Sequence, residues 1–168
     1  MKKNIQIVIL IILFLAAAFI GWRCYKVLKM KKEIGVIIHN LPKLNFQYFK
    51  KGDEIDDKPV IVSQFSPDCE HCQYMAEQIN LNQVAFKDCP VIMITGATKE
   101  RTEEFIKTYK LSELPFLSVG IDTSDYFYRT FGTNSIPSFF IYNREHKLIK
   151  TIKGETKIDN LTMAINRY

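Results

Sequence analysis

Two cysteines between a strand-like run and a helix-like run constrain the fold of this chain more than any other feature. The motif Cys-Glu-His-Cys at 69–72 follows the apolar run 60–65 and precedes the helix-like run 73–79. Unpaired N–H groups at the start of a helix carry partial positive charge, which favours the thiolate form of the first cysteine. The junction therefore predicts one thiolate ready for reaction and a second thiol behind it.

The number and spacing of the other cysteines and histidines argue against a disulfide scaffold or a structural zinc site. The chain has four cysteines, at positions 24, 69, 72 and 89, which is too few for a disulfide-stapled scaffold. A structural zinc site would need a second ligand pair at matching spacing, but Cys89, His39 and His146 are scattered singly. We therefore expect no metal site and a redox role for the pair. Cys89 is expected to be a buried small residue.

The chain begins with a membrane-length apolar segment. Residues 5–22 are apolar except for Gln6 and Gly21, and they are just long enough to cross a bilayer as a helix. Lysines at positions 2 and 3 precede them, as in a signal sequence or an anchor. Three alanines at 16–18 would suit signal cleavage, whereas continuation of the apolar run to Trp22 favours an uncleaved anchor, which we expect.

The chain is expected to have four parts. These are a short basic N-terminus (1–4), a transmembrane anchor (5–22), a juxtamembrane stalk (23–40) and one folded domain (41–168). Val27, Met30 and Ile34 recur at helical spacing, so the anchor helix is expected to continue into the stalk. Pro42 is expected to end it.

The net charge of +5 is concentrated at the N-terminus. Residues 1–32 hold seven of the 23 Lys and Arg residues and no acid, which leaves 16 basic against 18 acidic residues in the remainder. The folded domain is thus close to neutral, and nucleic acid is not expected as a partner. The basic cluster after the apolar run either contacts anionic lipid headgroups or forms a solvated linker.

The side of the membrane is contested by the sequence. Five basic residues at 23–32 follow the apolar run, whereas two lysines and the terminal amine precede it. Taken alone, the positive-inside rule would place the domain in the cytoplasm. A short basic N-terminus before an anchor is, however, the usual arrangement for an extracytoplasmic domain. We expect a single-pass inner-membrane protein whose domain faces the periplasm.

Apolar runs and breakers predict a mixed sheet with helices on both faces, an α/β fold. Asp68 is expected to cap the helix that begins near Cys69, Thr98 to cap the next one, and Gly132 to end a short helix. The expected strands are 44–49, 60–65, 91–94, 115–119 and a hairpin of 139–142 with 148–152; the expected later helices are 97–111, 122–131 and 157–168.

Two motifs in this order of elements carry a family resemblance. They are Phe65-Ser66-Pro67-Asp68-Cys69-Glu70-His71-Cys72 and Ser135-Ile136-Pro137-Ser138-Phe139. Over roughly residues 40–167 the chain resembles the thioredoxin fold. More closely, it resembles the membrane-anchored TlpA/ResA-type thiol–disulfide oxidoreductases, including the thioredoxin-like proteins common in Bacteroidetes.

The resemblance implies roles for four residues. Cys69 would be the exposed nucleophile and Cys72 the thiol that resolves the mixed disulfide. Pro137 would be a cis-proline beside the dithiol, with Ile136 at the surface that meets a partner. The resemblance also implies protein thiols and disulfides as substrates, a dithiol electron donor and no bound organic cofactor.

The two residues inside the motif are expected to tune the pair. His71, when protonated, would stabilise a nearby thiolate, and Glu70 would oppose it by like-charge repulsion. The chain also departs from the family. The buried acid of thioredoxins is missing from the strand before the motif, where Ser63 and Gln64 are nearby, and Met75 stands where the extracytoplasmic reductases often have a glutamate.

Three hypotheses for function remain open on the sequence. The first is an enzyme that reduces or exchanges protein disulfides outside the cytoplasm. The second is a thioredoxin-like binding module in which the cysteines form a static disulfide and the surface at Pro137 holds a partner. The third is copper or other metal delivery through Cys69, Cys72 and His71. Cycling of the cysteine pair distinguishes the first from the second.

Overall fold

The computed structural model describes residues 2–44 and 46–166, which divide between Val36 and Ile37 into two units. The first unit lies within α1 (Lys2–His39), a continuous helix in which the stretch Ile9–His39 is long and apolar enough to cross a membrane. The helix ends shortly before Pro42, as expected. The finer division into an anchor (5–22) and a stalk (23–40) stays a prediction, because no break in α1 separates the two.

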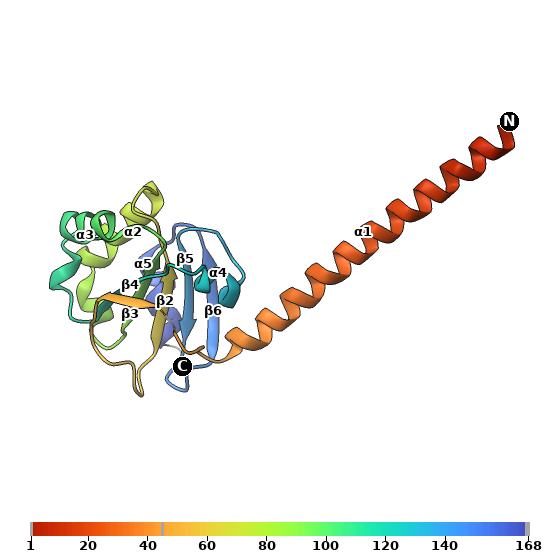
Figure 1. The fold of residues 1–168 in the computed structure, drawn as a ribbon. Coiled ribbons are helices and arrows are strands. Elements are labelled where there is room, and N and C mark those ends of the chain that lie inside the picture. Colours follow the sequence, from red (N-terminus) through yellow and green to blue (C-terminus); the bar gives the residue numbers. More distant parts are fainter. Residues whose placement is uncertain (1, 45, 167–168) are drawn as a thin grey trace. The chain divides into compact units, whose positions relative to one another are not determined.

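The second unit is built on a mixed sheet (Figure 1). Within the described residues the sheet has six strands in the order β1-β4-β3-β2-β5-β6. The strands β2, β3 and β4 are parallel, and β1, β5 and β6 each run antiparallel to their neighbours. Their bounds are β1 (Gln47–Lys50), β2 (Val60–Gln64), β3 (Val91–Thr95), β4 (Leu117–Ile121), β5 (Ser138–Tyr142) and β6 (Leu148–Lys153).

Helices cover both faces of this sheet. One face packs against α2 (Glu70–Leu81), α3 (Lys99–Thr108) and α5 (Ile158–Asn166), together with the 3₁₀ helix η1 (Gln83–Phe86). The opposite face packs against α4 (Tyr126–Phe131) and apolar residues of the segment 38–46. A second 3₁₀ helix, η2 (Leu111–Glu113), follows α3. The predicted α/β architecture is confirmed.

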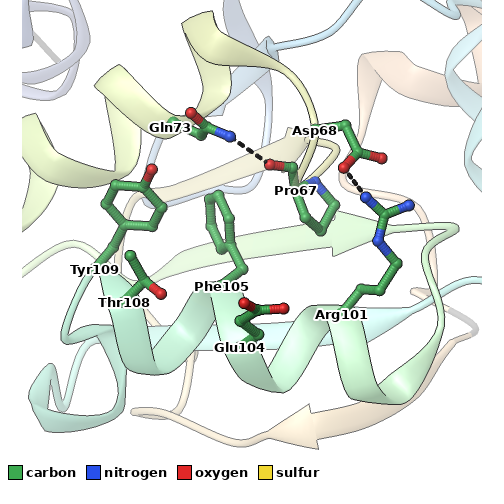
Figure 2. A pocket seen from close by; sticks show the side chains of 8 residues that line it. All are labelled: Pro67, Asp68, Gln73, Arg101, Glu104, Phe105, Thr108 and Tyr109. Carbon is green, nitrogen blue, oxygen red and sulfur yellow. Dashed lines mark hydrogen bonds and ion pairs between the residues drawn. The ribbon is translucent and has the colours of Figure 1, made fainter.

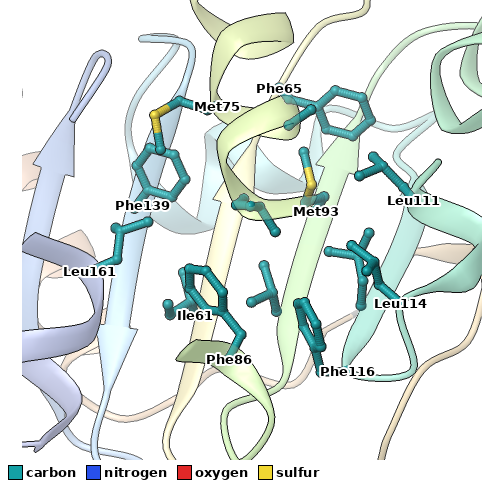
Figure 3. Packing of buried hydrophobic residues seen from close by; sticks show 14 of the residues in the cluster. Ile61, Phe65, Met75, Phe86, Met93, Leu111, Leu114, Phe116, Phe139 and Leu161 are labelled. Atoms are coloured by element: carbon teal, nitrogen blue, oxygen red, sulfur yellow. The ribbon is translucent and has the colours of Figure 1, made fainter. Parts of the chain in front are cut away.

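The central strands are buried on both sides, which is why they read as continuous apolar runs in the sequence. Ile61 of β2 points into the cluster under α2, whereas its neighbours Val60 and Val62 point into the cluster under α4. Figure 3 shows the first cluster, in which Met75 of α2 and Phe139 of β5 are both fully buried. This packing fixes α2, and with it the cysteine motif, on the sheet.

Two of the expected helices are shorter than predicted. Thr98 caps α3 as expected, and its hydroxyl accepts a hydrogen bond from the Arg101 N–H. The short helix begins at Tyr126 instead of Asp122, because the Asp122 carboxylate accepts backbone hydrogen bonds that fold the intervening residues into a turn. It ends at Gly132, whose φ of 65° is in the left-handed region. Of the last expected helix, residues 167–168 lie outside the described residues.

Asp122 is a buried carboxylate at the end of β4. It accepts the N–H groups of Ser124, Tyr126 and Phe127 at 2.7–3.0 Å. Burial raises the pKa of the Asp122 carboxyl, whereas these hydrogen bonds lower it. The combined effect of the hydrogen bonds is larger, so the pKa lies below the ordinary value. The carboxylate therefore stabilises the folded state above pH 4, and this contribution is lost as the pH falls through the lowered folded-state pKa.

We predict that Asp122→Asn lowers the free energy of unfolding by about 1–2 kcal/mol at pH 7, because charge-assisted hydrogen bonds become neutral ones. The difference from the wild type should shrink as the pH is lowered below about 4. Urea unfolding at several pH values measures both effects. Asp125→Asn, at an exposed carboxylate that makes no capping hydrogen bond, is the matched control. Equal stability of the Asp122 variant and the control at pH 7 would contradict the assignment.

Candidate dithiol site

The first cysteine is itself the residue that caps α2. Cys69 has an extended backbone with φ −89° and ψ 113°, and its carbonyl accepts the N–H groups of Cys72 and Gln73, each at 2.9 Å. The Cys69 side chain itself makes no capping hydrogen bond to the first turn. Cys69 is therefore placed at the positive pole of the helix, where an anionic sulfur is stabilised.

The prediction that Asp68 caps this helix is wrong. Asp68 lies one position before the cap, and its carboxylate pairs with the Arg101 guanidinium of α3 (Figure 2). Gln73 in the first turn of α2 donates from Nε2 to the carbonyl of Pro67 at 2.8 Å. Together these two contacts hold the loop that precedes the dithiol against α2 and α3.

The two cysteines differ sharply in environment. Cys69 is partly exposed, whereas Cys72 is 1 % exposed beneath the first turn of α2. Burial, with a smaller contribution from a hydrogen bond with Cys69, raises the pKa of the Cys72 thiol to about 12. The Cys72 thiol is thus protonated at neutral pH, and the arrangement offers one accessible sulfur in front of one buried sulfur.

The loop before β5 reaches the accessible sulfur. The Cys69 Sγ lies 3.9 Å from the carbonyl oxygen of Ile136, and the Ile136–Pro137 peptide bond is cis. Ile136 is exposed, whereas Pro137 is buried and its carbonyl accepts the N–H of Gly154 at 2.8 Å. Three segments that are far apart in the sequence therefore meet around Cys69.

The motif histidine contacts a residue that the sequence reasoning missed. His71 Nδ1 lies 2.8 Å from Glu155 Oε2, in the connection between β6 and α5. The two residues are 84 positions apart, and no local pattern in the sequence announces the contact. The other motif residue, Glu70, is exposed.

A hollow of about 330 Å³ opens beside Cys69 at the ends of β2 and β3. It is bounded by the loop before the dithiol and by the loop before β5, including Asn134 and Ile136. A second hollow of about 270 Å³ lies between the dithiol loop and α3 (Figure 2). The Asp68 and Arg101 pair lines both hollows. The surface around Cys69 is therefore indented, with an ion pair between the two indentations.

Two of the positions where the sequence departs from the family, Ser63 and Met75, are buried. Ser63 on β2 is 1 % exposed, and its hydroxyl has no hydrogen-bond partner within the described part of the chain. Met75 is also buried, and its sulfur accepts the N–H of Thr156 at 3.5 Å. Neither position supplies a carboxylate for handling the Cys72 proton.

The two remaining cysteines have different environments. Cys89 is buried just before β3, and burial raises the pKa of its thiol to about 12. Cys24 is exposed on α1, and all four cysteines are free thiols. Within residues 2–44 and 46–166, no three His, Cys, Asp or Glu side chains come together as a set of metal ligands.

Relatives of known name resemble nearly the whole chain. The thiol–disulfide oxidoreductase ResA of Bacillus thuringiensis is 27% identical over 170 residues, covering 96% of this chain and 95% of the relative. A ResA of Bacillus cereus matches to the same extent. No protein-family model matches the chain. The chain is a thioredoxin-like oxidoreductase.

Solved structures agree on the fold of this oxidoreductase. A secreted disulfide oxidoreductase of Mycobacterium tuberculosis superposes with a TM-score of 0.58 at 15% identity, covering 68% of this chain and 84% of that one. StoA from Bacillus subtilis superposes with a TM-score of 0.55 at 17% identity, covering 65% and 83%. The thioredoxin fold is confirmed. The resemblance to Bacteroidetes proteins stays a prediction, since the sequence relatives above come from Bacillus.

The structure of this thioredoxin-like oxidoreductase brings the residues singled out in the sequence to one place. Cys69, Ile136 and Pro137 adjoin one another, and Cys72 lies beneath Cys69. His71 lies near them in the first turn of α2. The roles assigned to these residues, and to Glu70, remain predictions.

Selective alkylation tests the asymmetry of the pair. In the reduced, folded Cys24→Ser protein at pH 8, we expect iodoacetamide to modify Cys69 at least about 100-fold faster than Cys72 or Cys89. The reason is that thiols with a pKa about 4 units above the pH have roughly 10⁻⁴ of their population as thiolate. Peptide mass spectrometry measures the modification at each site, and unfolding in urea should equalise the rates. Equal labelling of Cys69 and Cys72 in the folded protein would contradict the assignment.

Proposed function

We propose that the protein is a membrane-tethered thiol–disulfide oxidoreductase that uses Cys69 and Cys72 to reduce or exchange protein disulfides outside the cytoplasm. The observation that carries this proposal is the difference between the two sulfurs. Cys69 is accessible at the cap of α2, whereas Cys72 is buried with a pKa raised to about 12. A dithiol that exchanges disulfides in sequence needs one sulfur that attacks first and one that stays protonated until later.

The proposed reaction begins at the accessible sulfur. The Cys69 thiolate attacks one sulfur of a partner disulfide, and the other partner sulfur leaves as a thiolate, which takes up a proton. A mixed disulfide now joins Cys69 to the partner. Cys72 then loses its proton and attacks the Cys69 sulfur, which releases the second partner thiol. Two electrons pass to the partner, and the Cys69–Cys72 pair becomes a disulfide.

The first step also prepares the second. A hydrogen bond with Cys69 and the proximity of its sulfur both contribute to the raised pKa of the Cys72 thiol. Both contributions depend on Cys69 as a free thiol or thiolate, and both change once Cys69 is bonded to the partner. Burial, the largest cause, remains. We therefore expect Cys72 to ionise more readily in the mixed disulfide than in the resting dithiol.

The partner would approach along the loop before β5. Ile136 is 37% exposed there, and its carbonyl faces the Cys69 sulfur. An extended peptide that carries the target disulfide could pair with this backbone. A dithiol protein would then return the pair to its reduced state, so that no bound organic cofactor is needed.

The membrane part of the proposal rests on α1. Its apolar stretch is long enough to cross a bilayer, and the ResA relatives align along almost the full length of the chain. We propose a single-pass protein of the cytoplasmic membrane whose domain faces the extracytoplasmic side.

Single cysteine substitutions test the reaction. We expect Cys69→Ser to lower the rate of protein-disulfide reduction at least about 100-fold, because Cys72 and Cys89, the other cysteines of the folded domain, are buried. Cys72→Ser should instead accumulate mixed disulfides with the substrate, which non-reducing gels and mass spectrometry detect.

Cys89→Ser is the matched control, since it removes a buried thiol outside the proposed site and should leave turnover unchanged. Full activity of both Cys69→Ser and Cys72→Ser would contradict the dithiol mechanism. A pair that stays closed in the presence of a reducing dithiol would instead indicate a binding module with a static disulfide.

Reporter fusions test the membrane side. A C-terminal alkaline phosphatase fusion, expressed in a Gram-negative host, should be active because this reporter folds only where disulfides form. Deleting residues 5–22 should leave the same fusion in the cytoplasm and inactive. An inactive full-length fusion with a fluorescent cytoplasmic reporter at the same position would overturn the topology and favour the basic residues at 23–32.

A further inference from the structure

The contact between His71 and Glu155 has no part in the reaction described above. It joins the first turn of α2, which carries the dithiol motif, to the connection between β6 and α5. Nδ1 and Oε2 are 2.8 Å apart, which is within hydrogen-bond distance. The two side chains are 69% and 44% exposed, so the contact is accessible to solvent and modest in energy.

The backbone around Glu155 is held on both sides. The N–H of Gly154 donates to the carbonyl of Pro137 at 2.8 Å, and the N–H of Thr156 lies 3.5 Å from the Met75 sulfur. Gly154 has a φ of 84°, a conformation that favours glycine at this turn. Glu155 is thus carried by a segment fixed both to the loop before β5 and to α2. The Glu155 carboxylate consequently has a defined position relative to the dithiol.

A carboxylate beside Nδ1 sets the orientation of the imidazole and decides which ring nitrogen stays free. When Nδ1–H donates to Glu155, the orientation of the ring is fixed and Nε2 becomes the nitrogen that gains or loses a proton. A positive charge two residues after Cys69 would add to the partial positive charge of the helix start and stabilise the Cys69 thiolate.

Few other charges compete for His71. On α2 its neighbour Glu70 is exposed, and on the β6–α5 connection Lys153 and Lys157 flank Glu155 in the sequence. Residues 134–137 of the loop before β5 contain no ionisable side chain. Within the described part of the chain, Glu155 is the acid that pairs with His71.

We propose that Glu155 is a positioning residue for the dithiol, because its contact with Nδ1 fixes the His71 imidazole in the first turn of α2 and thereby makes the Cys69–Cys72 disulfide more oxidising. This inference rests on the proposed function and adds to it a residue that sets the redox equilibrium. Glu155 acts through His71 and does not contact the reacting sulfurs.

Two measurements on the reduced and oxidised protein test this proposal. The first is the pH profile of Cys69 alkylation, and the second is the equilibrium of the Cys69–Cys72 pair in glutathione buffers. Both use Glu155→Gln, Glu155→Asp, His71→Ala and the His71→Ala/Glu155→Gln double variant, all in a Cys24→Ser background. Glu145→Gln is the matched control, since Glu145 is an exposed glutamate in the turn between β5 and β6.

We expect Glu155→Gln to move the alkylation profile to higher pH and to shift the equilibrium about two- to fivefold toward the disulfide, the range for an exposed ion pair. Fivefold corresponds to about 20 mV for a two-electron couple. Glu155→Asp should restore much of the wild-type behaviour, and Glu145→Gln should change neither measurement. In the His71→Ala background, Glu155→Gln should have no further effect in this direction.

A direct effect of Glu155 on the thiolate would give the opposite result. Removing a nearby negative charge would then move the profile to lower pH, and equally so with or without His71. That outcome, or no shift at all while the pair still cycles, would overturn the inference and leave the proposed function intact. A pair that never forms a disulfide in any of these proteins would instead overturn the proposed function itself.

Discussion

The site depends on one structural constraint, the junction at which β2 leaves the sheet and α2 begins. β2 is buried on both faces, so the chain must emerge at the end of the strand and turn into the helix that covers it. The cap of the helix is accessible, whereas the residue one turn later faces the core. Cys69 and Cys72 occupy these two positions. Residues three apart lie on the same side of a helix, so their different burial comes from their place along α2: Cys69 is the cap at its end, whereas Cys72 lies in the first turn over the core.

The rest of the site is delivered by strand register. Gln64 at the end of β2 pairs with Ser138 at the start of β5, and Ser138 pairs with Lys153 at the end of β6. These three residues lie in a row across the ends of β2, β5 and β6, at the end of the sheet where α2 begins. Pro137 and Gly154 are the next residues beyond this row, which is why their segments meet beside Cys69. A slip of one residue in either strand pairing would turn the side chains to the other face of the sheet, and Pro137 and Gly154 would no longer lie beside the start of α2.

The parts of the structure that depend on local pattern could be predicted from the sequence. The buried strands, the Thr98 cap and the hairpin follow from apolar runs and breakers, and the place of Pro137 followed from family resemblance. The pairs of Asp68 with Arg101 and of His71 with Glu155 could not be predicted, because their partners are brought close only by the fold. The wrong prediction that Asp68 caps α2 has the same origin, since a rule based on neighbouring residues cannot include the Arg101 side chain that α3 brings to Asp68.

The two groups of contacts around the dithiol act on different quantities. Burial holds the Cys72 thiol protonated, and this large effect governs when the second sulfur can attack. The contacts on the rim are exposed, and each is worth no more than about 1 kcal/mol, or roughly 20 mV for a two-electron couple. The residues that make such contacts can be substituted without disturbing the packing of the core. In the proposed reaction the buried position of Cys72 thus sets the order of the steps, whereas the proposed role of His71 and Glu155 is to adjust the equilibrium between dithiol and disulfide.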